Sequence, residues 1–170
     1  LELDQTFMDL NAVLMALGND MVGVSEIFCP GRFTEKALAF DIQPGTAMDL
    51  RTGWDFNKPE DCERPKANII ENEPYMLIGS PMCKPFSQLQ AFAQHKDLEK
   101  KKAILMEGIA HLSFVMELYS IQINAGRKFL HEHPTGAWSW ALEEVQRVAS
   151  HPEVVVADGH QCPFGAMSSD

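Results

Sequence analysis

The chain has 170 residues, of which 45% are hydrophobic, and this is enough apolar material for one globular domain with a buried core. Its formal net charge is −10, which argues against autonomous DNA binding, since proteins that grip nucleic acid alone usually carry a basic face. No uninterrupted apolar run approaches the roughly 18 residues that cross a bilayer, and four cysteines without a C-x-x-C pair are too few for a disulfide scaffold.

The first residues of the chain carry no targeting signal. The stretch "LELDQTFMDL" has neither a basic region nor a continuous apolar segment, so we expect an intracellular protein, cytoplasmic or nuclear, with no membrane contact. Apolar side chains recur at helical spacing over residues 5–17 and Gly18 follows them, which predicts an N-terminal helix within residues 1–20. Because the chain begins at Leu1 rather than Met, we expect a trimmed piece of a longer protein.

The rest of the chain predicts strands and helices in alternation. Apolar and β-branched runs predict strands at 21–29, 46–50, 75–80, 127–134 and 153–160. Helical patterns begin near Thr34 and extend over 100–124 and 138–150. Residues 51–74 are polar and Pro-rich and predict one short central helix, and we expect residues 57–74 to form a surface excursion. This order predicts a single α/β domain over residues 21–170, with a Rossmann-like three-layer architecture of a parallel sheet covered by helices on both faces.

Polar and reactive residue types gather after the predicted strands. Gly31 follows the first strand, Asp49 ends the second, Cys83 follows the third and Glu132 lies near the end of the fourth. In an open α/β sheet, ligands bind beyond the carboxyl ends of the strands. The pattern is typical of a cleft at that edge, and it is also typical of ordinary loops.

Several of these stretches resemble motifs of the cytosine-C5 DNA methyltransferases, in the order that this family has. The family's motif for S-adenosylmethionine is similar to "SEIFCPGRFTEKAL", and its catalytic motif is similar to "MLIGSPMCKPFS", where Pro-x-Cys-x-x-Phe-Ser is the specific part. A strand of the family that ends in Glu-Asn-Val stands where this chain has "FLHEHPTG", and a later strand falls near "DGHQCPFGAM". The resemblance covers residues 22–167 and corresponds to the family's first half.

The resemblance implies a role for each matching residue. Cys83 is the nucleophile that adds to carbon 6 of a cytosine flipped out of the duplex, and this makes carbon 5 nucleophilic towards the methyl donor. Glu132 holds the base at N3 and the amino group, and Ser87 shapes the catalytic loop. The residues that bind S-adenosylmethionine are Phe28, Gly31, Asp49, Asp55 and Pro81, with Asp49 on the ribose hydroxyls.

The chain departs from the family at four positions. Pro30 and Arg32 stand where small residues are expected, Met82 replaces a proline, and His133 replaces the asparagine after the glutamate. The sequence also ends before the family's target-recognition region. We therefore expect that DNA is a partner only if the domain is active, and that contact with DNA needs regions outside this chain.

Other interpretations of the same residues stay open. Cys83 can also be a buried, inert thiol in a turn. Glu132 can be a carboxylate that pairs with a neighbouring histidine or arginine. Asp55 can be a turn or cap residue beside Trp54. As an alternative function, the chain is a catalytically degenerate methyltransferase-like module that acts as an interaction or assembly subunit with protein partners. A third hypothesis, weaker because the spacings are not those of zinc fingers, is a metal set made of His131, His133, His160 and Cys162.

Overall fold

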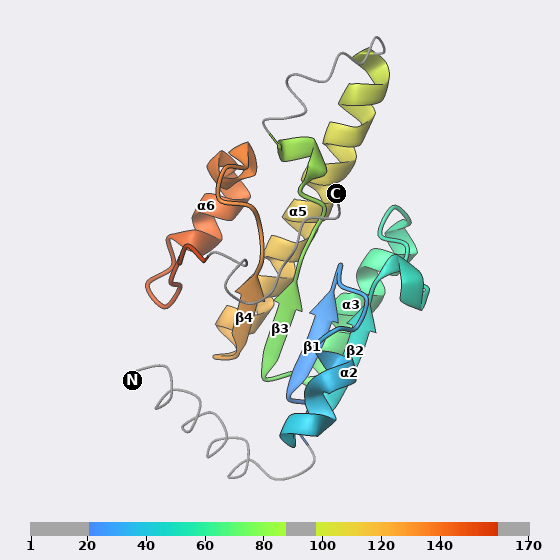
Figure 1. The fold of residues 1–170 in the computed structure, drawn as a ribbon, viewed down its shortest axis with the longest axis vertical. Helices are drawn as coiled ribbons and strands as arrows, with labels where there is room; N and C mark the ends of the chain where they lie inside the picture. The colour runs from blue at the N-terminus through green and yellow to red at the C-terminus, as the bar shows by residue number, and fades with distance from the viewer. Residues whose placement is uncertain (1–20, 88–97, 160–170) are drawn as a thin grey trace.

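A four-stranded parallel sheet forms the centre of the domain. The computed structural model describes residues 21–87 and 98–159 (Figure 1). The strands are β1 (Val24–Ile27), β2 (Pro44–Met48), β3 (Met76–Gly79) and β4 (Lys128–His131), in the order β2-β1-β3-β4, and every pair is parallel. The predicted α/β class with a Rossmann-like parallel sheet is confirmed. The predicted N-terminal helix lies outside the described residues.

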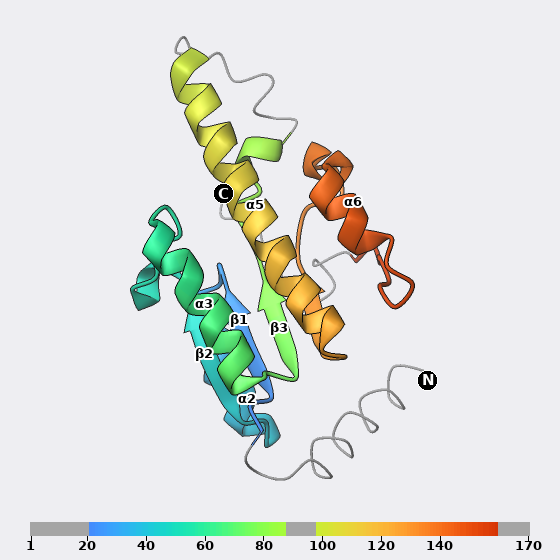
Figure 2. The ribbon, with the colours of Figure 1, turned by 180° about the vertical axis from the view of Figure 1, so that it is seen from behind.

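Helices cover both faces of the sheet because the chain reverses direction at β1. It first moves from β1 to β2 through α2 (Thr34–Ala37) and a 3-10 turn, and then passes back to β3 and on to β4. Crossovers between parallel strands are right-handed, so the reversal puts the second set of helices on the opposite face. Those helices are α3 (Pro59–Asn72) and α5 (Leu98–Asn124), and they lie behind the sheet in Figure 1 and in front of it in Figure 2.

The strands alternate their side chains between two apolar layers. Ile27 and Leu77 are fully buried in the larger core cluster, which they share with α3 and α5. Val24 and Ile78 point to the other face and pack with Ala37 of α2. Strands buried on both faces read as continuous apolar runs, which is why β1 and β3 were clear in the sequence.

Residues 57–74 do not form the predicted surface excursion, although the helix predicted at the centre of residues 51–74 is present. It is α3, a 14-residue helix that crosses from β2 to β3. Within residues 61–72, only the face that carries Asp61, Pro65 and Ile69 is buried, and the other positions are exposed or half-buried. Because one residue in four faces the core, the composition looked like that of a loop.

Helix α5 is 27 residues long, and by length and composition alone it could cross a membrane. The core helix of a globular domain meets the same criteria, and Val115, Leu118 and Tyr119 of α5 are fully buried against the sheet. Gly79 of β3 lies so close to this helix that the hydroxyl of Tyr119 occupies the place of a Cβ. The described residues thus form a small globular domain, and the cellular compartment stays a prediction.

The predicted fifth strand is wrong for the residues that the structure describes. Residues 153–159 form no strand, and the side chains of Val155 and Val156 are 87% and 60% exposed. Val154 N donates to His151 O in a turn after α6 (Glu143–Ala149), which holds the segment away from sheet pairing. The predicted helix 138–150 is likewise divided, because Leu142 is extended between the 3-10 turn η4 (Trp138–Ala141) and α6.

Candidate functional site at the carboxyl ends of the strands

The carboxyl ends of β1 and β3 mark the topological switch point of the sheet. From β1 the chain moves outward to β2, whereas from β3 it moves outward to β4, so the two connections leave in opposite directions. Ligands of doubly wound sheets bind in the crevice at such a point. The sequence-predicted residues on the β1, β2, β3 and β4 loops all follow the carboxyl ends that meet at this edge (Figure 1).

The loop after β1 is held by Glu26, a residue that the sequence analysis did not single out. Glu26 is fully buried, and its Oε2 accepts hydrogen bonds from Thr34 N (2.7 Å), Thr34 Oγ1 (2.7 Å) and Phe33 N (3.1 Å). The carboxylate thereby closes the loop onto the start of α2. A charged residue inside an otherwise apolar strand was the available signal, because a buried charge requires partners.

Two residues of this loop have left-handed backbone conformations. Gly31 has φ +85°, and a Cβ there would lie 3.3 Å from both Ala47 Cβ and Thr34 Oγ1. Phe28 has φ +54°, which is rare for a residue other than glycine and costs of the order of 1–3 kcal/mol. The loop is therefore tight and partly strained where it meets the sheet edge.

Cys29 of the same loop is a buried thiol beside Glu26. Its burial, together with the neighbouring Glu26 carboxylate, raises the pKa of Cys29 to about 11. A thiol in this environment stays protonated at neutral pH, and the thiolate is the nucleophilic form. Cys29 is therefore structural in the described fold.

Phe28 contributes its ring to an aromatic cluster on the α5 side of the sheet. The ring centroid lies 4.6 Å from that of Phe56 and 5.0 Å from that of His111. His111 Nε2 is 3.1 Å from Asn57 Oδ1, and burial lowers the pKa of this histidine. Phe28 as a whole is half-buried.

Asp49 follows β2 directly and caps the next turn. Its Oδ1 accepts from Arg51 N at 3.0 Å, while Asp49 N donates to Thr52 Oγ1 at 3.0 Å. This reciprocal pattern is a capping box at η2 (Leu50–Thr52). The side chain is half-exposed at the end of β2, where the predicted ribose contact requires it.

Asp55 takes part in a local turn. Its Oδ1 accepts from Asn57 N at 3.2 Å, and its Oδ2 lies 3.5 Å from Lys58 Nζ. The Arg64 guanidinium stacks over the Trp54 ring, 4.1 Å from the ring centroid. These contacts agree with the turn interpretation of Asp55 and do not test the cofactor interpretation.

Cys83 lies in the loop between β3 and the 3-10 turn η3 (Lys84–Phe86). Pro81 is buried, Cys83 is half-buried, and Cys83 O accepts from Phe86 N at 3.0 Å. Phe86 anchors the turn in the core. The turn packs so tightly on α5 that a Cβ at Gly108 would lie 2.8 Å from Pro85 Cγ, and α5 therefore determines where the thiol stands.

Glu132 follows β4 on the neighbouring strand. Glu132 N donates to Gly79 O at 3.0 Å, so its backbone pairs with the last residue of β3, and its side chain is exposed. Cys83 lies four residues beyond Gly79. The two chains leave the sheet at the same edge, and the shared pocket of thiol and carboxylate stays a prediction.

His131 and His133 both face the α5 side and form an aromatic stack. Their ring centroids are 5.4 Å apart, with Trp140 edge-on to both. His131 Nδ1 lies 3.2 Å from the Tyr119 hydroxyl and His133 Nε2 lies 2.8 Å from Ser139 Oγ. Burial, with the neighbouring His133 as a smaller cause, lowers the pKa of His131 to about 3, so the ring is neutral at physiological pH.

Within residues 21–87 and 98–159, no group of three or more His, Cys, Asp or Glu side chains is arranged to hold a metal ion. His160 and Cys162 of the hypothetical metal set lie outside these residues.

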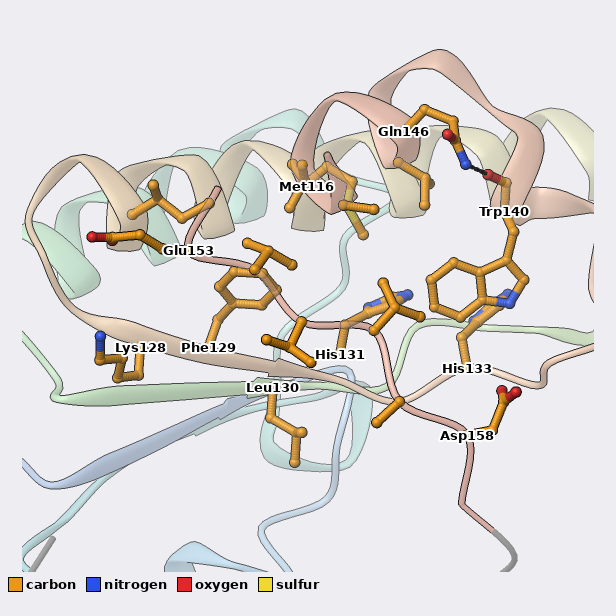
Figure 3. A pocket seen from close by; sticks show the side chains of 18 of the residues that line it. Met116, Lys128, Phe129, Leu130, His131, His133, Trp140, Gln146, Glu153 and Asp158 are labelled. Atoms are coloured by element: carbon orange, nitrogen blue, oxygen red, sulfur yellow. Dashed lines mark hydrogen bonds between the residues drawn. The ribbon is translucent and has the colours of Figure 1, made fainter. Parts of the chain in front are cut away.

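A cavity of the described domain lies beside β4, away from the switch point. It has a volume of about 500 Å³ and is enclosed by β4 and the residues after it, by α5 and α6, and by residues 153–158. Figure 3 shows His131, His133 and Trp140 at one end, Phe129 in the middle, and Lys128 with Glu153 at the other end. None of the predicted catalytic or cofactor-binding residues lines this cavity.

No protein-family model, curated protein or solved structure matches the chain.

Proposed function

We propose that the chain is an S-adenosylmethionine-dependent methyltransferase-like domain of the cytosine-C5 type, which acts on DNA through Cys83. One observation carries the proposal: the parallel register pairs Gly79 with His131, so that Cys83 and Glu132 follow neighbouring strands at the switch-point edge. Asp49 and the Glu26-held loop follow β2 and β1 at the same edge. Nucleoside cofactors of doubly wound sheets bind at this place.

The residues around the switch point fit a nucleoside cofactor. Gly31 draws the β1–α2 loop against β2, and the strained Phe28 presents part of its ring beside it. Backbone strain of this kind clusters at ligand sites. Arg32 is exposed, so its charge is solvated rather than buried against a cationic sulfonium. S-adenosylmethionine would supply an electrophilic methyl group here, with Asp49 on the ribose.

In the proposed reaction, the Cys83 thiolate would form a bond to carbon 6 of cytosine, and carbon 5 would then take the methyl group as its bond to the sulfonium sulfur breaks and S-adenosylhomocysteine leaves. Glu132 would hold N3 and the amino group of the base, which assists protonation of the ring as the thiolate adds. Loss of the carbon 5 proton and of the thiolate releases methylated base and free Cys83. Splitting the transfer in this way lowers the barrier, because carbon 5 of free cytosine is a poor nucleophile.

The deciding experiment is equilibrium binding of S-adenosylmethionine to the purified chain by calorimetry. Asp49→Asn keeps a cap residue at η2 but removes the charge that would meet the ribose, so it should weaken binding about tenfold. Glu71→Gln removes one charge from an exposed position of α3 and serves as the matched control. Absence of binding by the folded wild-type chain would refute the proposal.

A second measurement separates binding from chemistry. Cys83→Ser should abolish methyl transfer to DNA while cofactor affinity stays nearly unchanged, because the thiol forms the bond to the base. Full activity of this variant would show that the assigned mechanism is wrong.

The second candidate function is a catalytically degenerate module that acts as an interaction subunit. It is favoured by the cavity beside β4, because none of the residues proposed for methyl transfer lines it. A folded chain that binds no S-adenosylmethionine would support this candidate.

A further inference from the structure

The outer side of β4 carries backbone groups that have no partner within the described residues. Lys128 N and Glu132 N donate to Tyr75 O and Gly79 O, so these residues turn their N–H groups towards β3. With a strand period of two, Phe129 and His131 turn their N–H and C=O groups away from β3. No hydrogen bond to these four groups is found in residues 21–87 and 98–159. An edge of this kind is a template for another strand.

The cavity lies along this open edge. Its volume is about 500 Å³, and all four residues of β4 line it. Figure 3 shows the cavity extending along β4 between Lys128 and His133.

The cavity wall is suited to alternate apolar side chains. Val145 and Val148 of α6 and Met116 of α5 form its inner side, and Val156 lies on the outer segment. His131 at one end is neutral and hydrogen-bonded to Tyr119, so it adds an aromatic surface rather than a charge. Because the chain has a net charge of −10, a neutral or basic segment is electrostatically favoured over an acidic one.

This chain does not readily supply the strand. Residues 154–158 close the outer side of the cavity and are anchored at both ends, by Val154 N on His151 O (2.9 Å) and by Thr135 Oγ1 on Asp158 Oδ1 (3.2 Å). Pairing them with β4 would break these anchors. Residues 160–170 contain proline, glycine and a polar end, and residues 5–17 have helical periodicity, so neither stretch has a strand pattern.

We propose that the cavity beside β4 is an acceptor site for an extended polypeptide segment that is not part of this sequence. The segment adds to the sheet next to β4, pairs with the N–H and C=O groups of Phe129 and His131, and buries apolar side chains at alternate positions against α6. This is recognition by strand addition, in which main-chain hydrogen bonds provide affinity and side-chain pockets provide specificity. The inference does not rest on the proposed methyl transfer.

The test uses a generic strand-forming peptide as the probe, acetyl-Lys-Val-Thr-Val-Thr-Val-Lys-amide, with the isotope-labelled chain observed by NMR. In the free chain, the amides of Phe129 and His131 should exchange with solvent about tenfold faster or more than the amide of Leu130. The peptide should slow their exchange at least about tenfold. The same peptide N-methylated at its five central residues should have no effect, because it cannot donate the hydrogen bonds of a strand.

Two aspartate variants test whether the peptide enters the cavity. Val156 and Ile70 are both 60% exposed, but only Val156 lines the cavity. Val156→Asp should weaken peptide binding about tenfold, because the bound peptide would remove water from the new carboxylate. Ile70→Asp should leave the affinity for the peptide unchanged. Circular dichroism checks that both variants keep the wild-type fold.

Four outcomes would overturn the proposal. In the first, the amides of Phe129 and His131 in the free chain are protected from exchange as strongly as the amide of Leu130. In the second, the methylated peptide binds as tightly as the unmethylated one, and in the third the two aspartate variants bind the peptide with equal affinity. In the fourth, no binding is detected at about 1 mM peptide. Binding of S-adenosylmethionine is a separate measurement, so failure here leaves the proposed reaction intact.

Discussion

The switch-point edge of the sheet and the outer edge of β4 differ in how their polar groups are hydrogen-bonded. At the switch point, Oε2 of the buried Glu26 accepts three hydrogen bonds and closes the β1–α2 loop, while its Oε1 is buried without a hydrogen-bond partner among the described residues. Beside β4, backbone groups of Phe129 and His131 and the buried Nδ1 of His133 have no partner within the described residues. The loop at the first edge is held by hydrogen bonds from a buried side chain, whereas the backbone groups at the second edge are unpaired within the described residues.

The largest effect is expected at the switch-point edge. Glu26→Ala removes the acceptor of Phe33 N, Thr34 N and Thr34 Oγ1, and hydrogen bonds to charged groups contribute about 1.5–3 kcal/mol each without being additive. We expect the free energy of unfolding to fall by about 4 kcal/mol in chemical denaturation. Glu35→Ala, at an exposed position of α2, is the control and should lower it by less than about 0.5 kcal/mol. Equal losses would show that Glu26 does not hold the loop.

A pH effect is expected at the β4 side. The folded pKa of His131 is lowered to about 3, below the unfolded value of 6.5, so the unfolded chain binds an extra proton between these values. Stability due to this group is therefore fully present above pH 6.5 and is lost as the pH falls, by about 1.4 kcal/mol per pH unit. Between pH 6.5 and 4.5, wild type should lose about 2–3 kcal/mol more than His131→Asn. Parallel losses in urea melts would contradict a buried neutral ring.

The contact between η3 and α5 predicts an effect of intermediate size. Gly108→Ala places a Cβ 2.8 Å from Pro85 Cγ and 3.3 Å from Phe86 Cζ, and overpacking typically costs about 1–3 kcal/mol. The variant should also change the rate at which a thiol reagent modifies Cys83, because the turn that carries this thiol must shift. Gly136→Ala has open space around the new Cβ and should behave like wild type. An unchanged melting temperature and thiol reactivity in Gly108→Ala would refute this packing.

The smallest effect is expected at η2. Asp49→Ala removes the cap of Arg51 N, and loss of such a cap on a partly exposed turn costs about 0.5–1 kcal/mol. Asp49→Asn keeps an acceptor oxygen and should lower stability by a few tenths of a kcal/mol at most. If both variants have the stability of wild type, the capping box does not contribute, and any loss of cofactor binding in them would be a direct effect on the ligand.

The sequence analysis succeeded where the local pattern is decisive. The runs that became β1 and β3 are apolar throughout because both faces of these strands are covered, and the alternation of elements led to the confirmed α/β class. For α3 it predicted a helix but underestimated its length, because the three buried positions are spaced along one face of a polar helix. It was wrong for residues 153–159, whose valines have strand propensity but no pairing in the described fold.

For the candidate site, the sequence located the strand ends but not their supports. Asp49, Cys83 and Glu132 were predicted because reactive residue types follow apolar runs, and their roles stay a prediction. Glu26 was missed because its partners, Phe33 and Thr34, are brought to it only by the turn of the loop. The cavity beside β4 had no local signal at all, because α5, α6 and residues 153–158 form it together from distant parts of the chain.

By itself, the sequence determined the class of fold, the positions of the four strands and the residue types at their carboxyl ends, because hydrophobic period and turn residues act over a few neighbouring positions. Only the tertiary structure decided the strand order, the burial of Glu26 and the open edge of β4. These features depend on which distant segments come together, and that is set by the summed packing and hydrogen bonding of the whole domain rather than by any local run of residues.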